Sequence, residues 1–241
     1  MRPLLGQLRA ELLLASRRGE NLLVTLVIPV ALLLFFGVGM PNALPGGGGR
    51  EFLVPGILAL AVVSTSMVSL GIATAFERYY GVLKRLVGSP LPVGSLLAAK
   101  TLSVLAIECV QAALILGLAV SVLGWRPAGS LPLALAALLI GSVAFAGLGL
   151  LMAGTLRAEA TLAAANGLYV VFLLIGGFVF PLDQLPGPIA LVAGILPAGA
   201  LANATRAALS GNPSTAYGSL ATLVGWAVLS GWLAARTFRA E

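Results

Sequence analysis

The chain has 241 residues, of which 59% are hydrophobic and only 9% are charged, and its mean hydropathy is +1.06. Soluble domains are typically about 45–50% apolar and about 25% charged, so this composition excludes a soluble globular protein. The net charge of +6 would fit nucleic-acid binding, but the cations lie at the ends of apolar segments. Topology signals and phospholipid contacts have that distribution, so we expect contact with membrane phospholipid and none with nucleic acid.

Residues 1–20 have the pattern of an amphipathic helix. Their apolar positions recur at helical spacing, at Leu5, Leu8, Leu12 and Ala15. Polar residues, including Glu11, fall on other faces. Such a segment lies in the plane of the membrane interface, held there by cations. The cations expected to do this are Arg2, Arg9, Arg17 and Arg18. A basic tail without fixed structure is the alternative.

Long apolar segments follow in chain order, and a membrane-spanning helix needs about 20 such residues. Six segments qualify, at about 22–40, 52–75, 101–123, 131–155, 162–180 and 217–236. The sequence therefore predicts an all-α integral membrane protein with six transmembrane helices, in which residues 1–241 form one transmembrane domain.

The distribution of cations orients these helices. With the N-terminus in the cytoplasm, eleven of the fourteen Lys and Arg residues are cytoplasmic, and only Arg50, Arg126 and Arg206 are outside. Both termini are then cytoplasmic. Twelve of the fourteen cations are Arg, which together with the many Ala and Gly residues suggests a high-GC bacterium. We expect a bacterial cytoplasmic membrane.

The stretch "FERYYGVLKRLVGSP" (residues 76–90) joins the second and third segments. Apolar and aromatic residues alternate with charges at helical spacing, and Ser89-Pro90 stops the pattern. This predicts a short amphipathic helix on the cytoplasmic side. Such a helix could be an interfacial anchor, or it could dock into a groove of a cytosolic partner.

Glu108 lies about seven residues into the third segment, and Gln111 shares its helical face. A charge near the bilayer centre costs about 2.5–3.5 kcal/mol on insertion scales, so such a residue faces protein or water. Two interpretations stay open. One is a substrate path or proton-sensitive site, and the other is a hydrogen bond that holds helices or protomers together.

The segment 181–211 is interrupted by prolines at 181, 186, 188 and 197. These prolines divide it into two helical pieces that are each too short to span. We expect a pair of short helices that enter the outer leaflet. An outer loop with surface helices is the alternative.

Missing residue types argue against catalysis. The chain has no histidine, one cysteine and a single aspartate, Asp183. Intramembrane proteases need histidine, and enzymes that use metal-bound pyrophosphate need clustered aspartates. We expect no enzymatic activity and no cofactor bound by this chain. Residues 94–101 approach a phosphate-binding loop, but Ala99 replaces its second glycine, so Lys100 is expected to anchor the third span instead.

These motifs resemble the membrane subunits of type-2 ABC exporters, the group that includes daunorubicin-resistance permeases. The resemblance is carried by "FERYYGVLKRLVGSPLPVGSLLAAK" (76–100), "FPLDQLP" (180–186), "LPAGALANATRAAL" (196–209) and the six-span layout. It implies that residues 76–92 are a coupling helix that contacts a separate cytosolic ABC ATPase, which would bind ATP and Mg. The contacting residues would be Glu77, Arg78, Tyr79, Tyr80, Gly81, Leu83, Lys84 and Arg85.

The resemblance also implies a homodimer that exports a drug, a lipid or a similar amphipathic substrate between its protomers. The outer segment would close the exit, and its candidate gate residues are Asp183, Pro197 and Arg206. An ion-driven secondary transporter or a small channel is the alternative function.

Overall fold

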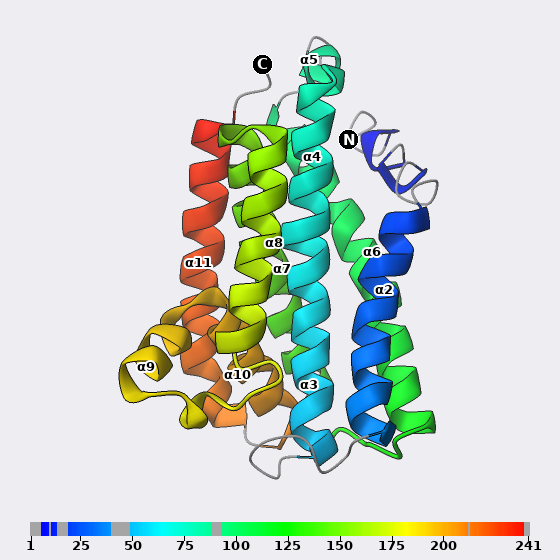
Figure 1. Cartoon of the computed structure of the whole chain (residues 1–241), viewed down its shortest axis with the longest axis vertical. Coiled ribbons are helices and arrows are strands. Elements are labelled where there is room, and N and C mark those ends of the chain that lie inside the picture. Colours follow the sequence, from blue (N-terminus) through cyan, green and yellow to red (C-terminus); the bar gives the residue numbers. More distant parts are fainter. Residues whose placement is uncertain are drawn as a thin grey trace.

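The computed structural model describes residues 6–9, 11–13, 19–39, 49–87, 93–211 and 213–238, without the side chains of 19–24, 85–87, 93 and 213. The described residues are helical or lie in turns and contain no strand, which confirms the all-α prediction. Long helices lie side by side along the long axis of the molecule (Figure 1). Arg2, Arg17 and Arg18, assigned above to an interfacial helix, lie outside the described residues.

Five described helical segments are long and apolar enough to cross a membrane. They are Gly49–Tyr79, Gly94–Ser121, Leu131–Thr155, Ala158–Ile175 and Ala216–Thr237. The number rises to six if the bent pair α9 and α10 counts as one span. The first predicted span, 22–40, corresponds to α2 (Gly19–Leu34) and the π-helical η1 (Phe35–Gly39), where residues Thr25–Gly39 form a shorter apolar helix.

Several predicted boundaries differ from the structure. The second predicted span, 52–75, is longer and runs over Gly49–Tyr79. The third begins at residue 101 in the prediction, but α6 runs over Val93–Ser121 and includes the buried Lys100. The fifth, 162–180, is displaced toward the N-terminus as α8 (Ala158–Ile175). Gly177 adopts a left-handed conformation with φ 73° just after α8, which stops the helix before the apolar residues end. The fourth prediction matches α7 (Leu131–Thr155), and the sixth matches α11 (Ala216–Thr237) within one residue at each end.

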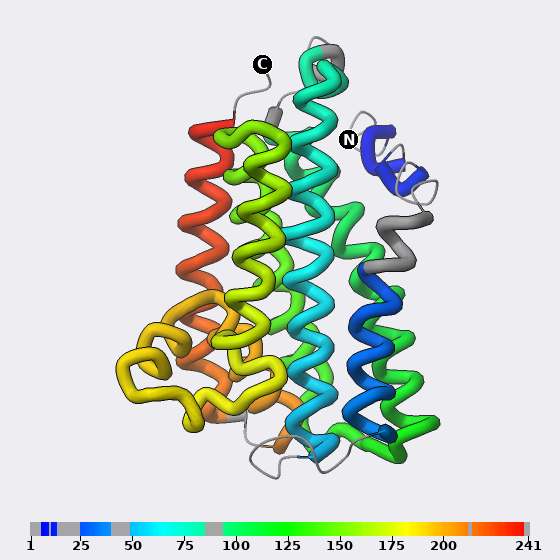
Figure 2. Tube along the Cα trace, viewed as in Figure 1, coloured from blue at the N-terminus to red at the C-terminus, as the bar shows by residue number. Residues whose placement is uncertain are grey.

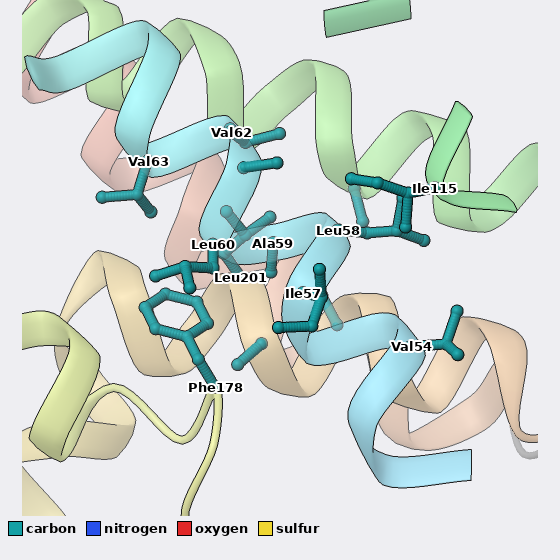
Figure 3. Packing of buried hydrophobic residues seen from close by; sticks show 14 of the residues in the cluster. Val54, Ile57, Leu58, Ala59, Leu60, Val62, Val63, Ile115, Phe178 and Leu201 are labelled. Carbon is teal, nitrogen blue, oxygen red and sulfur yellow. The ribbon is translucent and has the colours of Figure 1, made fainter. Parts of the chain in front are cut away.

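The segment at the centre of the bundle consists of α3 (Gly49–Val62), the π-helical η2 (Val63–Ser69) and α4 (Leu70–Tyr79). All residues from Leu53 to Val62 are buried, because α2, α6, α7 and α10 pack around α3. Figure 3 shows side chains of this stretch against Ile115 of α6, Leu201 of α10 and Phe178. The central segment therefore contacts helices from most of the bundle.

Gly56 of α3 is in close contact with the chain that follows α8. A Cβ atom at this position would lie 2.1 Å from the backbone oxygen of Phe178. We expect Gly56→Ala to lower the free energy of unfolding by about 1–3 kcal/mol, since either backbone must shift. Gly167→Ala is the control: nothing lies within 4 Å of its added methyl group, so helix propensity alone should stabilise α8 by about 0.5–1 kcal/mol. Thermal unfolding of both variants in detergent measures the difference, and equal unfolding temperatures would contradict the packing.

One end of the bundle carries α5 (Val82–Val87), with the C-terminal end of α11 and the helical residues 6–9 and 11–13 nearby (Figures 1 and 2). The predicted helix 76–92 is not continuous. Phe76–Tyr79 complete α4, and a turn at Tyr80–Gly81 separates them from α5. Gly81 has φ 71°, a conformation that favours glycine and ends the helix there.

The opposite end carries the two short helices predicted in the segment 181–211, preceded by η3 (Leu182–Gln184). They are α9 (Gly187–Ile195) and α10 (Pro197–Leu209), and the angle between them is 80°. Pro197 begins α10, where a missing backbone N–H costs nothing. Most of α10 is buried against α3, α7 and α11, and η4 (Pro213–Thr215) then leads into α11. The structure contains two short helices in this segment, and their depth in a membrane stays a prediction.

Candidate functional site

An exposed aromatic pair lies at the tip of α4. Tyr79 and Tyr80 are 65% and 69% exposed, and their ring centroids are 5.2 Å apart in an edge-to-face arrangement. Phe76 stacks on Tyr80 at 6.2 Å and fixes the ring from behind. Apart from these ring contacts, about two thirds of the surface of each tyrosine stays exposed. Aromatic side chains are the kind of residue that dominates the binding energy of protein interfaces.

The other residues of the predicted coupling segment divide into exposed and internal groups. Lys84 is exposed, whereas Leu83 is completely buried and holds α5 within this chain. The family resemblance implies that Leu83 contacts the ATPase, but in this structure its side chain is enclosed by the chain itself. The guanidinium of Arg78 donates to the backbone oxygen of Leu156 at the end of α7. The side chain of Arg85 lies outside the described residues, and Gly81 provides the turn.

A buried ion-pair cluster joins three parts of the chain beneath the tyrosines. Lys100 Nζ lies 2.5 Å from Glu77 Oε2 and 3.0 Å from Glu11 Oε1, and its side chain is only 1% exposed. Lys100 is thus not a membrane anchor, because its ammonium group is inside the protein and paired. Likewise Glu77 faces Lys100 and is 7% exposed. Glu11 points into the bundle and not away from it, while Arg9 is exposed.

This cluster links α4 and α6 to the N-terminal helical residues. Buried ions need partners because their hydration is lost, and one lysine here serves two carboxylates from segments far apart in sequence. The arrangement fixes the base of the tyrosine-bearing tip to the start of α6.

A second polar cluster surrounds Glu108 and Gln111, deeper in α6. The hydroxyls of Ser66 in η2 and Ser142 in α7 contact the two carboxyl oxygens of Glu108. Thr65 donates to Gln111 Oε1 at 2.9 Å, and the Gln111 amide donates to the backbone oxygen of Thr25 in α2 at 3.1 Å. These hydrogen bonds join α2, η2, α6 and α7. They agree with the interpretation that Glu108 and Gln111 hold helices together.

A partly polar pocket of about 240 Å³ lies between α2, η2, α4 and α8. Its polar lining consists of Thr25, Ser64, Ser69, Asn166 and Tyr169, and none of the described residues that line it is charged. Hydroxyl and amide groups on an otherwise apolar wall suit an amphipathic ligand that forms a few hydrogen bonds. This pocket could not be predicted from the sequence, because its lining residues come from four elements that are separate along the chain.

The predicted gate residues occupy different places at the α9–α10 end. Arg206 of α10 donates to the Gly177 oxygen at 2.8 Å and lies 3.7 Å from the ring centroid of Phe52 in α3. Pro197 is buried at the bend between α9 and α10, and Asp183 in η3 is exposed. Arg206 therefore joins α10 to the start of α3 and to the end of α8 by a hydrogen bond and a cation–π contact.

The structure defines the class of protein: several apolar spans, polar clusters buried among them, and no group of three potential metal ligands among the described residues. This is a multi-pass membrane protein. Residues 7–210 match the family of the ABC-2 type transporter, and the chain belongs to that family.

Two curated relatives have the same printed name, "Probable multidrug ABC transporter permease YbhR", one from Escherichia coli strain K12 and one from Escherichia coli O157:H7. Each is 26% identical to this chain over 140 residues. The alignments cover 57% of this chain and 38% of each relative, so the chain matches well under half of the length of these proteins.

Proposed function

We propose that this chain is the membrane subunit of an ATP-driven ABC exporter, powered by a separate cytosolic ATPase. Family membership supports the class, and the relatives' printed name, a probable multidrug ABC transporter permease, supports a drug as the type of substrate. The observation that carries the proposal is the exposed pair Tyr79 and Tyr80 at the tip of the helical segment Gly49–Tyr79. That single segment extends from the candidate docking surface to the opposite end of the bundle.

The proposed mechanism uses the contacts of this segment at both ends. ATP binding would move the ATPase subunits and with them the tyrosine tip. Glu77 and Lys100 would transmit the motion to α6, so we assign Glu77 to this internal link instead of to the docking surface. At the far end, α3 contacts Arg206 of α10 through Phe52, so movement of α3 would release or close the outer helices.

We further propose six spans, with α2–η1 as the first and α9–α10 as a re-entrant pair and not a span. With both termini and α5 in the cytoplasm, eleven of the fourteen cations, including Lys84 and Arg236, are cytoplasmic, which is the excess that the positive-inside rule describes. The pocket between α2, η2, α4 and α8 would belong to the substrate path, completed by a second copy of the chain. Its exposed apolar neighbours, including Ile28 and Val170, would face that copy or lipid.

Co-purification tests the proposed function. The tagged chain is solubilised gently from native membranes, the proteins that accompany it are identified, and ATP hydrolysis by the eluate is measured. We expect an ABC ATPase in stoichiometric amount, together with hydrolysis. A chain that elutes alone and hydrolyses no ATP would contradict the proposal and favour an ion-driven transporter.

A further inference from the structure

The carboxyl group of Glu108 has no part in the proposed docking or gating. It is 7% exposed, within the α6 span, and it lies where η2, α6 and α7 meet. Ser66 contacts its Oε1 atom and Ser142 contacts its Oε2 atom. Buried ionisable groups in a membrane span are costly, so each one calls for an account of its charge and its partners.

The protonation state of Glu108 can be inferred by counting the protons that are available for its hydrogen bonds. Ser142 Oγ also lies 2.8 Å from the backbone oxygen of Leu138, so three oxygen–oxygen contacts connect Ser66, Glu108, Ser142 and Leu138. A serine hydroxyl has one proton to donate, while a carbonyl oxygen and an ionised carboxylate can only accept. The two serines therefore supply two protons for three contacts.

We propose that Glu108 is a proton-binding site that carries its proton in this conformation. The third proton then comes from Glu108 itself. Its Oε2–H donates to Ser142 Oγ, the Ser142 hydroxyl donates to the Leu138 oxygen, and the Ser66 hydroxyl donates to Oε1. Every contact holds one hydrogen bond. If Glu108 were ionised, the single proton of Ser142 would face two acceptors.

The surroundings of Glu108 favour the neutral acid. The described side chains around it from α3, η2, α6 and α7 are apolar or carry hydroxyl, amide or thiol groups. Gln111 is bound to Thr65 and to the Thr25 oxygen. The titratable Cys109 is adjacent on α6, and the nearest described cation on α6 is Lys100, about two turns away and paired with Glu77 and Glu11. An ionised carboxylate would thus be buried without a counter-charge.

A small cavity lies beside the Glu108 carboxyl group. It has a volume of about 30 Å³ and is lined by Glu108, Cys109 and Ser142 together with apolar residues such as Leu139. One water molecule needs about 10–15 Å³ by the same measure, so the cavity can hold a water beside the carboxyl. Cys109 and Leu139 are exposed, so the cavity lies near the exposed face of the α6–α7 helix pair.

Binding of the proton to Glu108 would also be coupled to the arrangement of η2, α6 and α7. Ser66 and Thr65 are adjacent in η2, and both bond to α6. Loss of the proton leaves a bare charge and one unsatisfied contact at this junction, so the ionised form disfavours the observed arrangement of η2, α6 and α7. Proton binding at Glu108 and the packing of the central segment therefore stabilise each other.

Infrared spectroscopy of the purified full chain in an ester-free detergent tests the proposal, because a protonated carboxyl has a C=O band separate from carboxylate and amide bands. At neutral pH we expect this band in the natural protein and its loss in Glu108→Gln. The glutamine should fold, since its oxygen can accept from Ser66 and its N–H can donate to Ser142. Glu159→Gln, at an exposed carboxyl on α8, is the matched control and should keep the band.

Ser142→Ala gives a second signature. Removing the acceptor of the Glu108 proton should shift the band without abolishing it. Absence of the band in the natural protein, or its survival in Glu108→Gln, would overturn the proposal. None of these readings depends on transport or on an ATPase, so the result stands apart from the proposed function.

Discussion

Replacing Tyr79 and Tyr80 together by alanine is expected to weaken binding of the proposed ATPase subunit by about 30-fold or more, because truncating an aromatic hot spot costs about 2 kcal/mol or more. Both side chains are largely exposed, so the free energy of unfolding should change by less than about 0.5 kcal/mol. The measurement is the amount of ATPase that co-purifies with the chain, together with thermal unfolding of the chain alone.

Tyr217→Ala is the matched control for this variant. Tyr217 is 63% exposed, but it lies at the start of α11, at the opposite end of the bundle from α5 (Figure 1). Its replacement should leave ATPase binding unchanged. Undiminished binding in the double tyrosine variant would remove the main support for docking at the tip of α4.

Lys100→Ala should have the largest effect on stability. It leaves the carboxylates of Glu77 and Glu11 buried without their shared cation, and breaking a buried ion pair on one side costs about 3–5 kcal/mol. Lys84→Ala provides the comparison at an exposed lysine and should change stability by less than about 0.5 kcal/mol. Thermal unfolding of each purified variant in the same detergent gives the two values.

A triple variant separates charge from packing. Combining Lys100→Met with Glu77→Gln and Glu11→Gln removes all three charges, and much of the lost stability should return, since no ion is then left unpaired. We expect this variant to fold but to couple ATP hydrolysis poorly to transport, because the link between α4 and α6 is weaker. A Lys100→Ala protein as stable as the natural one would show that the cluster does not hold these elements together.

The long helices could be predicted from sequence because span length and apolar composition are local properties. The segment 131–155 was predicted with the bounds of α7, and the prolines of 181–211 predicted two short helices. The end of α8 was missed, since the apolar run continues past the point where Gly177 turns the chain. Apolar composition does not reveal where a backbone changes direction.

The polar contacts could not be predicted, because they depend on which helices become neighbours. Glu77 and Lys100 were assigned to surfaces, as isolated charges usually are, yet their pairing buries both. Ser66 and Ser142 carry no sequence signal that distinguishes them from other hydroxyls in apolar spans. The π-helical turn of η2, which brings Thr65 and Ser66 onto α6, likewise has no recognisable motif.

Photo-crosslinking from the tip of α4 tests the central claim most directly. A photoreactive phenylalanine derivative replaces Tyr80 in one variant and Tyr217 in another, native membranes are irradiated, and the adducts are identified by mass spectrometry. If the tip of α4 docks onto an ABC ATPase, we expect an adduct with that ATPase from position 80 and none from position 217. Absence of an ATPase adduct at position 80, or the same adduct at both positions, would contradict docking at this surface.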